Sequence, residues 1–293
     1  EGETVETLAD FRLTRFGLAR RQADGPVEPL WPLPADVIVT SDVLENATYF
    51  QPTEPGNGIA SSYPLPLLPV FAAGKPGKPE SGLWLNRAGI TAWLAAAPIK
   101  PEHLLRASQL WTSDSRLGIA LDAERRSAAE GKIYTTEAIA LAKDIGFVIA
   151  SNGHAQQLSR GDIVRLGGDG RAATIHGVTL NTPESDWARI EREGRFRLLL
   201  TTPGIFANGW EPEGIPAQLV AASVNRAETI SGWDILTGKP KPAQRIAPTG
   251  SVYWFDKLAD VQTLKDLADN GLSLNDPARR AEGFNHCRIA PWA

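Results

Sequence analysis

From residue 116 onward, the pattern of apolar and polar positions is typical of β-strands. The predicted strands cover residues 116–122, 132–140, 146–151, 161–166, 171–178, 197–201, 218–224 and 251–256. Residues 167–170 are mostly glycine and are expected to form a tight turn between two of these strands. The pattern from residue 116 onward therefore predicts a mainly β region.

A helical spacing of apolar residues predicts three short helices between the strands. Asn86 is expected to cap a helix that stops before Pro98. Ser185 is expected to cap a second helix that ends near Gly194, and a third covers residues 260–269. Strands interleaved with a few helices indicate an α+β fold.

Residues 22–82 show little helical periodicity and are rich in proline and glycine. Proline has no N–H to give to a sheet, so extended packed loops are expected in this stretch rather than strands.

Composition sets outer limits on the fold. The 293 residues are 42% hydrophobic and 22% charged, which suits one large domain or two smaller ones. We find no apolar run long enough to cross a bilayer and no leader, and the single cysteine, Cys287, suits a reducing cytoplasm. The chain has no methionine and begins at Glu1, so a longer natural chain is expected.

The search for catalytic chemistry finds no recognisable site. The four histidines are scattered without metal-ligand spacing, and no nucleotide-binding glycine motif or nucleophile elbow is present. Asp114 with Asp122, or Glu211 with Glu213, are candidate carboxylate pairs, although solvated surface charge explains them more simply. The sequence therefore predicts no catalytic residue, no metal site and no cofactor.

The net charge of −4 argues against non-specific binding of nucleic acid, which needs many phosphate-neutralising cations. A local basic patch is enough for a short stretch of RNA. Residues 238–245 offer one, since Lys239, Lys241 and Arg245 lie in a segment stiffened by proline. A plain solvated loop remains the other interpretation of this segment.

Five phrases, in order, resemble one family. They are RLGIALD at 116–122 with GKIYTTE at 131–137, LGGDGRA at 166–172, LLTTPGIF at 199–206 with GWEP at 209–212, GWD at 232–234 with residues 239–253, and EGFN at 282–285. Together they resemble the third subunit of the Cmr (type III-B CRISPR) effector complex, a Cas5-like member of the RAMP superfamily.

The resemblance implies two ferredoxin-like, RRM-related units with inserted β-hairpins and long loops. The first would occupy residues 1–115, and residues 116–293 would hold the hairpin region and the second. The family's opening strand is not recognisable, and Asn285 stands where another glycine is usual. Such a subunit would bind the 5′ tag of the guide RNA, dock on the large polymerase-like subunit and contact the backbone subunits, without catalysis of its own.

The candidate RNA-binding residues are the cations, glycines and aromatic side chains within these phrases. Tyr134 and Phe284 are the candidates for stacking a base. The full set is Arg116, Lys132, Tyr134, Gly168, Arg171, Lys239, Lys241, Arg245, Gly283 and Phe284. Two rival functions stay open: a carbohydrate hydrolase with paired carboxylates, and an adaptor that contacts only proteins.

Overall fold

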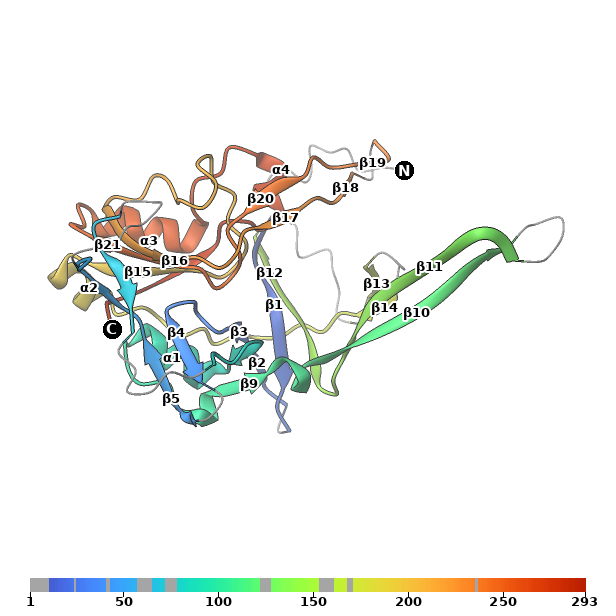
Figure 1. Ribbon diagram of the computed structural model, residues 1–293, viewed down its shortest axis with the longest axis horizontal. Helices are drawn as coiled ribbons and strands as arrows, with labels where there is room; N and C mark the ends of the chain where they lie inside the picture. Colours follow the sequence, from blue (N-terminus) through green and yellow to red (C-terminus); the bar gives the residue numbers. More distant parts are fainter. Residues whose placement is uncertain are drawn as a thin grey trace.

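The computed structural model describes residues 11–23, 25–40, 43–56, 65–71, 78–121, 128–152, 161–167, 171–234 and 237–293. Strands dominate these residues, arranged in several small antiparallel sheets with a few short helices, so the α+β prediction is confirmed (Figure 1). Among the described helices, none is long and apolar enough to cross a membrane.

The largest sheet has four strands in the order β16-β21-β15-β22, with antiparallel neighbours throughout. These strands are β15 (Phe196–Leu200), β16 (Gln218–Ser223), β21 (Val252–Asp256) and β22 (Cys287–Ala290). Three helices accompany them: α2 (Trp187–Glu193), α3 (Val261–Asn270) and α4 (Pro277–Ala281). Every residue of β15 is buried, because both faces of the sheet are covered.

Alternation along β15 assigns its side chains to two cores. Leu198 points to one face, where it packs with Ile190 of α2 and Leu264 of α3. Leu199 points to the other face, into a second core supplied by the first part of the chain. The strand order and directions are those of a ferredoxin-like sheet, but residues 201–217 hold no helix between the first two strands, so two ferredoxin-like units are not confirmed.

The first part of the chain forms small sheets around helix α1 (Arg87–Leu94). One sheet has the order β12-β1-β2, another β3-β8-β9, and two further pairs are β4–β5 and β6–β7. Their bounds are β1 (Arg12–Arg21), β2 (Val27–Pro29), β3 (Trp31–Pro32), β4 (Val37–Thr40), β5 (Val43–Tyr49), β6 (Gln51–Thr53), β7 (Leu68–Val70), β8 (Leu83–Leu85), β9 (Leu104–Arg106) and β12 (Ile145–Asn152). Because β1 pairs with β12, strands on the two sides of residue 115 share one sheet. The division at that residue stays a prediction.

Long hairpins extend from these sheets. The longest, β10 (Trp111–Leu121) with β11 (Ala128–Leu141), reaches far from the rest of the chain on the right of Figure 1. Shorter pairs are β13 (Ile163–Leu166) with β14 (Arg171–Thr174), β17 (Glu228–Ile230) with β20 (Gln244–Ile246), and β18 (Trp233–Asp234) with β19 (Lys239–Pro240). Two 3₁₀ turns, Pro101–His103 and Ala107–Gln109, flank β9.

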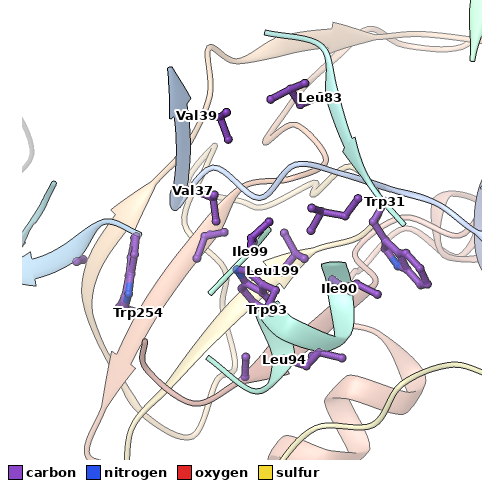
Figure 2. Close-up of a cluster of buried hydrophobic side chains, with 14 of the residues drawn as sticks. Trp31, Val37, Val39, Leu83, Ile90, Trp93, Leu94, Ile99, Leu199 and Trp254 are labelled. Carbon is purple, nitrogen blue, oxygen red and sulfur yellow. The ribbon is translucent and has the colours of Figure 1, made fainter. Parts of the chain in front are cut away.

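The core between the first part of the chain and the four-stranded sheet is built around tryptophans, as Figure 2 shows. Trp93 of α1 and Trp254 of β21 are almost fully buried there. Beside them, Arg197 Nη1 donates to Asp36 Oδ2 at 2.5 Å, and Trp93 Nε1 donates to Asp36 Oδ1 at 2.9 Å. Burial raises the pKa of Asp36, while Arg197 and the Trp93 hydrogen bond oppose that shift. This buried ion pair joins residues 161 positions apart.

The structure corrects two sequence predictions. Residues 22–82 are not only loops, since strands β2 to β7 lie there. Their prolines lie at strand ends or in very short strand pairs, such as Pro52 opposite Pro69. Ser185 does not cap α2, because its hydroxyl donates to the Ile289 carbonyl while Asp186 accepts from the Arg189 N–H. The Asn86 cap is confirmed, with its Oδ1 2.9 Å from the Gly89 nitrogen.

Candidate nucleic-acid interface

The β10–β11 ribbon has two chemically different faces. Cross-strand partners share a face, so the register places Arg116 beside Thr136 and Gly118 beside Tyr134 on one side. Lys132, two residues before Tyr134 on the same strand, has the same orientation by alternation. Arg116, Lys132 and Tyr134 are all exposed, so three predicted RNA-binding residues lie together on one face.

Arg171 of β14 joins this face through a carboxylate. Arg116 Nε and Nη2 donate to Asp114 Oδ2 at 3.0 and 2.7 Å, and Arg171 Nη2 lies 4.0 Å from the same oxygen. The Arg116 hydrogen bond lowers the pKa of Asp114. One carboxylate thus holds two cations near each other. Gly168 lies outside the described residues.

Gly118 is required by the position of the Tyr134 ring. A Cβ at residue 118 would lie 2.3 Å from Tyr134 Cζ, so the ring lies across the glycine. The absence of a side chain at Gly118 therefore presents the Tyr134 ring flat on the cationic face of the ribbon.

The opposite face of the ribbon is aliphatic. Its cross-strand pairs include Ile119 with Ile133 and Leu117 with Thr135. Leu117, Ile119 and Ile133 are 69%, 47% and 66% exposed and lie together, whereas the Ser115–Glu137 pair separates them from Ile139 on the same face. The ribbon is therefore amphipathic across its thickness.

The basic segment predicted as a loop forms parts of two hairpins, β18–β19 and β17–β20. Lys239 and Arg245 are exposed, but Lys241 forms an ion pair with Glu282. Its backbone N–H also donates to the Gly232 carbonyl at 2.8 Å. Lys241 is thus engaged within the chain, whereas Lys239 and Arg245 present their charges to solvent.

Arg279, which the sequence did not single out, ties this segment to α4. It is 4% exposed and donates to Gln244 Oε1 at 3.0 Å, to the Ser231 carbonyl at 3.2 Å and to Glu282 Oε2 at 3.0 Å. Its guanidinium also lies 5.5 Å from the Phe284 ring centroid. Phe284 is itself buried, so its ring is not a free stacking platform in this structure.

The backbone of Gly283 lies close to Leu13 of the same chain. At φ +84 a Cβ there would lie 2.9 Å from Leu13 Cβ and 3.0 Å from the Leu13 carbonyl oxygen. Asn285 follows at φ 65, and its side chain bonds both backbone groups of Ile205. The glycine that the sequence linked to RNA thus first serves the packing against β1.

The structure also contains a central cavity of about 910 Å³ that no sequence pattern predicted. Its lining comes from β1, β12, the base of the ribbon and the C-terminal strand. Along β1, Arg15 and Gly17 face one side and Phe16 and Leu18 the other, and all four residues line the cavity, so we call the two parts of its lining the polar lobe and the apolar lobe. Arg15, His286 and Arg288 line the polar lobe, and Phe16, Trp84, Trp111 and Phe147 the apolar one.

Burial changes the pKa values of the charged and titratable residues of the polar lobe. Burial, followed by the charge of Arg288, lowers the pKa of Arg15 to about 10, and burial lowers the pKa of Arg288. Burial also lowers the pKa of His286, whose Nε2 is 2.9 Å from the Leu13 carbonyl oxygen. In the described parts of the chain, no group of three or more His, Cys, Asp or Glu side chains is arranged to hold a metal ion.

Comparisons with known proteins identify the family. A search of curated proteins gave no match. Among solved structures, one cryo-EM chain of the Type III-B Cmr-beta complex bound to cognate target RNA is 15% identical, with a TM-score of 0.49 over 94% of this chain and 75% of that chain. A second, from the same complex with target RNA and AMPPnP, is 16% identical, with a TM-score of 0.43 over 88% of this chain and 74% of that one. The sequence matches the family described as CRISPR-associated protein (Cas_Cmr3) over residues 2–292. This chain therefore belongs to the Cas_Cmr3 family of CRISPR-associated proteins.

Proposed function

We propose that this chain is a non-catalytic subunit of a type III-B CRISPR effector complex that binds the 5′ tag of the guide RNA. In the same proposal it docks on the large polymerase-like subunit and contacts the backbone subunits. Membership of the Cas_Cmr3 family supports the assignment to such a complex. The cationic face of the β10–β11 ribbon is the observation that carries the RNA-binding part.

That face combines the features that single-stranded RNA needs. Arg116 and Lys132 supply charge for phosphates, and the exposed Tyr134 ring supplies a surface for a base. Arg171 adds a second guanidinium beside Asp114. On the β18–β19 and β17–β20 hairpins, Lys239 and Arg245 supply further exposed cations. The overall charge of −4 makes such local patches necessary for binding RNA.

The aliphatic face of the ribbon supports docking to a protein. Leu117, Ile119 and Ile133 lie together on this face and are exposed in the isolated chain. An apolar surface of this kind is typical of an interface with another protein, whereas RNA phosphates favour the opposite face. One ribbon can thus bind guide RNA and a neighbouring subunit at the same time.

The hydrolase alternative receives no support from the described carboxylates. A glycosidase needs a general acid with a raised pKa facing a second carboxylate. Asp36 is the described carboxyl group whose pKa is raised, and it is fully buried against Arg197. Asp114 is ion-paired with Arg116, while Asp122 lies outside the described residues. The other alternative, an adaptor that contacts only proteins, differs from the proposed function because it binds no RNA.

Neutralising the ribbon is expected to weaken tag binding. For Arg116→Gln with Lys132→Gln, the affinity for tagged guide RNA should fall about tenfold or more at low salt, and the slope of log affinity against log salt should drop by about 0.7 for each phosphate that the variant no longer neutralises. Fluorescence anisotropy across a salt series measures both quantities. Arg226→Gln, which changes an exposed arginine outside the ribbon, is the matched control.

An unchanged affinity and salt slope in the ribbon variant would show that this face does not hold RNA. Cross-linking the assembled complex to its guide then separates the remaining cases. Adducts elsewhere in the chain would show that the RNA site lies outside the ribbon, and a complete lack of adducts would favour the adaptor.

Gly118→Ala is expected to act on RNA through Tyr134. The new methyl group would collide with the Tyr134 ring, and because Tyr134 is exposed the ring turns into solvent with little effect on stability. Binding of tagged RNA should then weaken by about 1–3 kcal/mol, as in Tyr134→Ala. The double variant should bind RNA no more weakly than either single variant, and a double-mutant cycle of binding affinities measures this. Thermal unfolding of all three variants should stay unchanged. Additive effects would show that Gly118→Ala weakens binding independently of the Tyr134 ring, and an unchanged affinity in Tyr134→Ala would show that Tyr134 does not stack on RNA.

A further inference from the structure

Two arginines from opposite ends of the sequence share the polar lobe of the central cavity. Arg15 belongs to β1 and Arg288 to β22, the edge strand of the four-stranded sheet. They are near enough that the charge of Arg288 lowers the pKa of Arg15. Within the described residues, no carboxylate forms an ion pair with either guanidinium, in contrast to Arg197 with Asp36.

Arg15 also has an unused donor. Its Nε is buried and has no hydrogen-bond partner within the described residues. Its guanidinium rests 4.5 Å from the centroid of the Trp31 ring, which fixes the group in place without neutralising its charge. With its pKa at about 10, Arg15 stays protonated at neutral pH. Within the described residues, the half-buried Arg15 guanidinium has no ion-paired carboxylate and its buried Nε has no hydrogen-bond acceptor.

A β-bulge interrupts β1 next to Arg15. The register with β12 shifts between Leu13 and Arg15, so Thr14 is an extra residue on β1. Such a bulge re-aims the side chains that follow it. A Cβ at Gly17, the next residue on the Arg15 face, would meet only the Leu30 carbonyl oxygen, at 4.0 Å. The strand therefore directs Arg15 into the cavity and leaves space beside it.

The acidic residues of the cavity do not neutralise the two arginines. Burial lowers the pKa of Arg288, and the charge of Asp269 opposes this shift without forming an ion pair with Arg288. Glu282 is already bound by Arg279 and Lys241. Threonines 14, 182, 201, 202 and 249 also line the cavity, and hydroxyl groups are ready donors to an anion.

We propose that the polar lobe of the central cavity is a phosphate-binding site, in which Arg15 and Arg288 together hold one phosphate mono- or diester. Two guanidinium groups can offer paired N–H donors to phosphate oxygens, and this fork geometry matches a phosphate group. The two nearby carboxylates disfavour a second phosphate in the same lobe. The phosphate belongs either to the backbone of bound RNA, which rests on the proposed function, or to a free nucleotide.

Thermal unfolding of the full chain in inorganic phosphate tests the site itself. Phosphate should raise the unfolding temperature of the wild type, because it binds only the folded state, and should not do so in Arg15→Gln with Arg288→Gln. Gly17→Val, which fills the space without removing charge, should also abolish the shift. Arg226→Gln should keep it.

Stability without phosphate separates a binding role from a structural one. If Arg15 is a charge that awaits an anion, Arg15→Met should unfold at the wild-type temperature or above it and should no longer respond to phosphate. Destabilisation of Arg15→Met, with a phosphate response that persists in the double variant, would overturn the proposal.

RNA binding distinguishes the two sources of phosphate. If the phosphate is part of RNA, the double variant should bind a short single-stranded RNA about tenfold more weakly, with a smaller salt slope. If binding of inorganic phosphate and AMP depends on both arginines but RNA affinity does not, the site holds a free ligand. The ribbon variants leave the cavity intact. If RNA binding weakens in the ribbon variants but not in the cavity variants, the proposed function stands, and the phosphate held in the cavity does not come from RNA.

Discussion

Asp36→Ala is expected to lower the free energy of unfolding by about 3–5 kcal/mol, because it leaves the Arg197 guanidinium buried without its counter-charge. Both side chains are completely inaccessible to solvent. Arg197 also donates to the Pro291 carbonyl at 2.9 Å and to the Trp93 carbonyl at 3.0 Å, so its position is fixed and it cannot turn outward to water. Denaturant unfolding monitored by tryptophan fluorescence measures the destabilisation.

The double variant Asp36→Leu with Arg197→Met is the informative control. It removes both charges and keeps apolar volume, so it should be considerably more stable than Asp36→Ala. Asp114→Ala breaks an exposed pair of the same chemistry on the ribbon and should leave the unfolding midpoint nearly unchanged. If Asp36→Ala were no more harmful than Asp114→Ala, the ion pair would not organise the core.

Asn285→Ala is expected to cost about 3 kcal/mol, from backbone strain together with the removal of three hydrogen bonds. Asn285 is fully buried at φ 65, a conformation that alanine adopts poorly. Its Oδ1 accepts from the Ile205 N–H at 2.7 Å, and its Nδ2 donates to the carbonyls of Ile205 and Ser273 at 3.1 and 3.0 Å. Truncation would leave those backbone groups buried without that partner.

Asn285→Gly separates the two causes. Glycine accepts the positive φ, so this variant should lack only the side-chain bonds and be about 1 kcal/mol more stable than Asn285→Ala. Chemical denaturation of both variants gives the difference. Equal stabilities would mean that the left-handed backbone at residue 285 carries no strain.

Local patterns predicted the elements well. The strand predicted at residues 197–201, the Asn86 cap and the apolar spacing of α3 depend on neighbouring residues, and each is confirmed. Prolines misled the prediction for residues 22–82, because β-pairs only two or three residues long tolerate a residue without an N–H. Asp186 caps α2 in place of Ser185, because the Ser185 hydroxyl bonds Ile289, 104 residues away.

The candidate site was predictable only where neighbours in sequence stay neighbours in space. Alternation along β11 brings Lys132 and Tyr134 to one face, and that much follows from the strand. Lys241 has the same local pattern as Lys239, but it is neutralised by Glu282, which is distant in sequence. Arg15 and Arg288 carry no local signal, since only the fold brings residues 15 and 288 together.

The packing of β1 against the last part of the chain has a consequence during synthesis. Gly283 packs on Leu13, and His286 Nε2 lies 2.9 Å from the Leu13 carbonyl oxygen. A ribosome adds residues at about 5–20 per second, so β1 waits on the order of tens of seconds for these partners. Until then Leu13 lacks these two contacts, whereas Leu18 of the same strand packs with Leu30, Leu105 and Leu110, which are synthesised much earlier. The contacts of Leu13 with Gly283 and His286 therefore form only after residue 286 has been synthesised, later than the core around Leu18 can form.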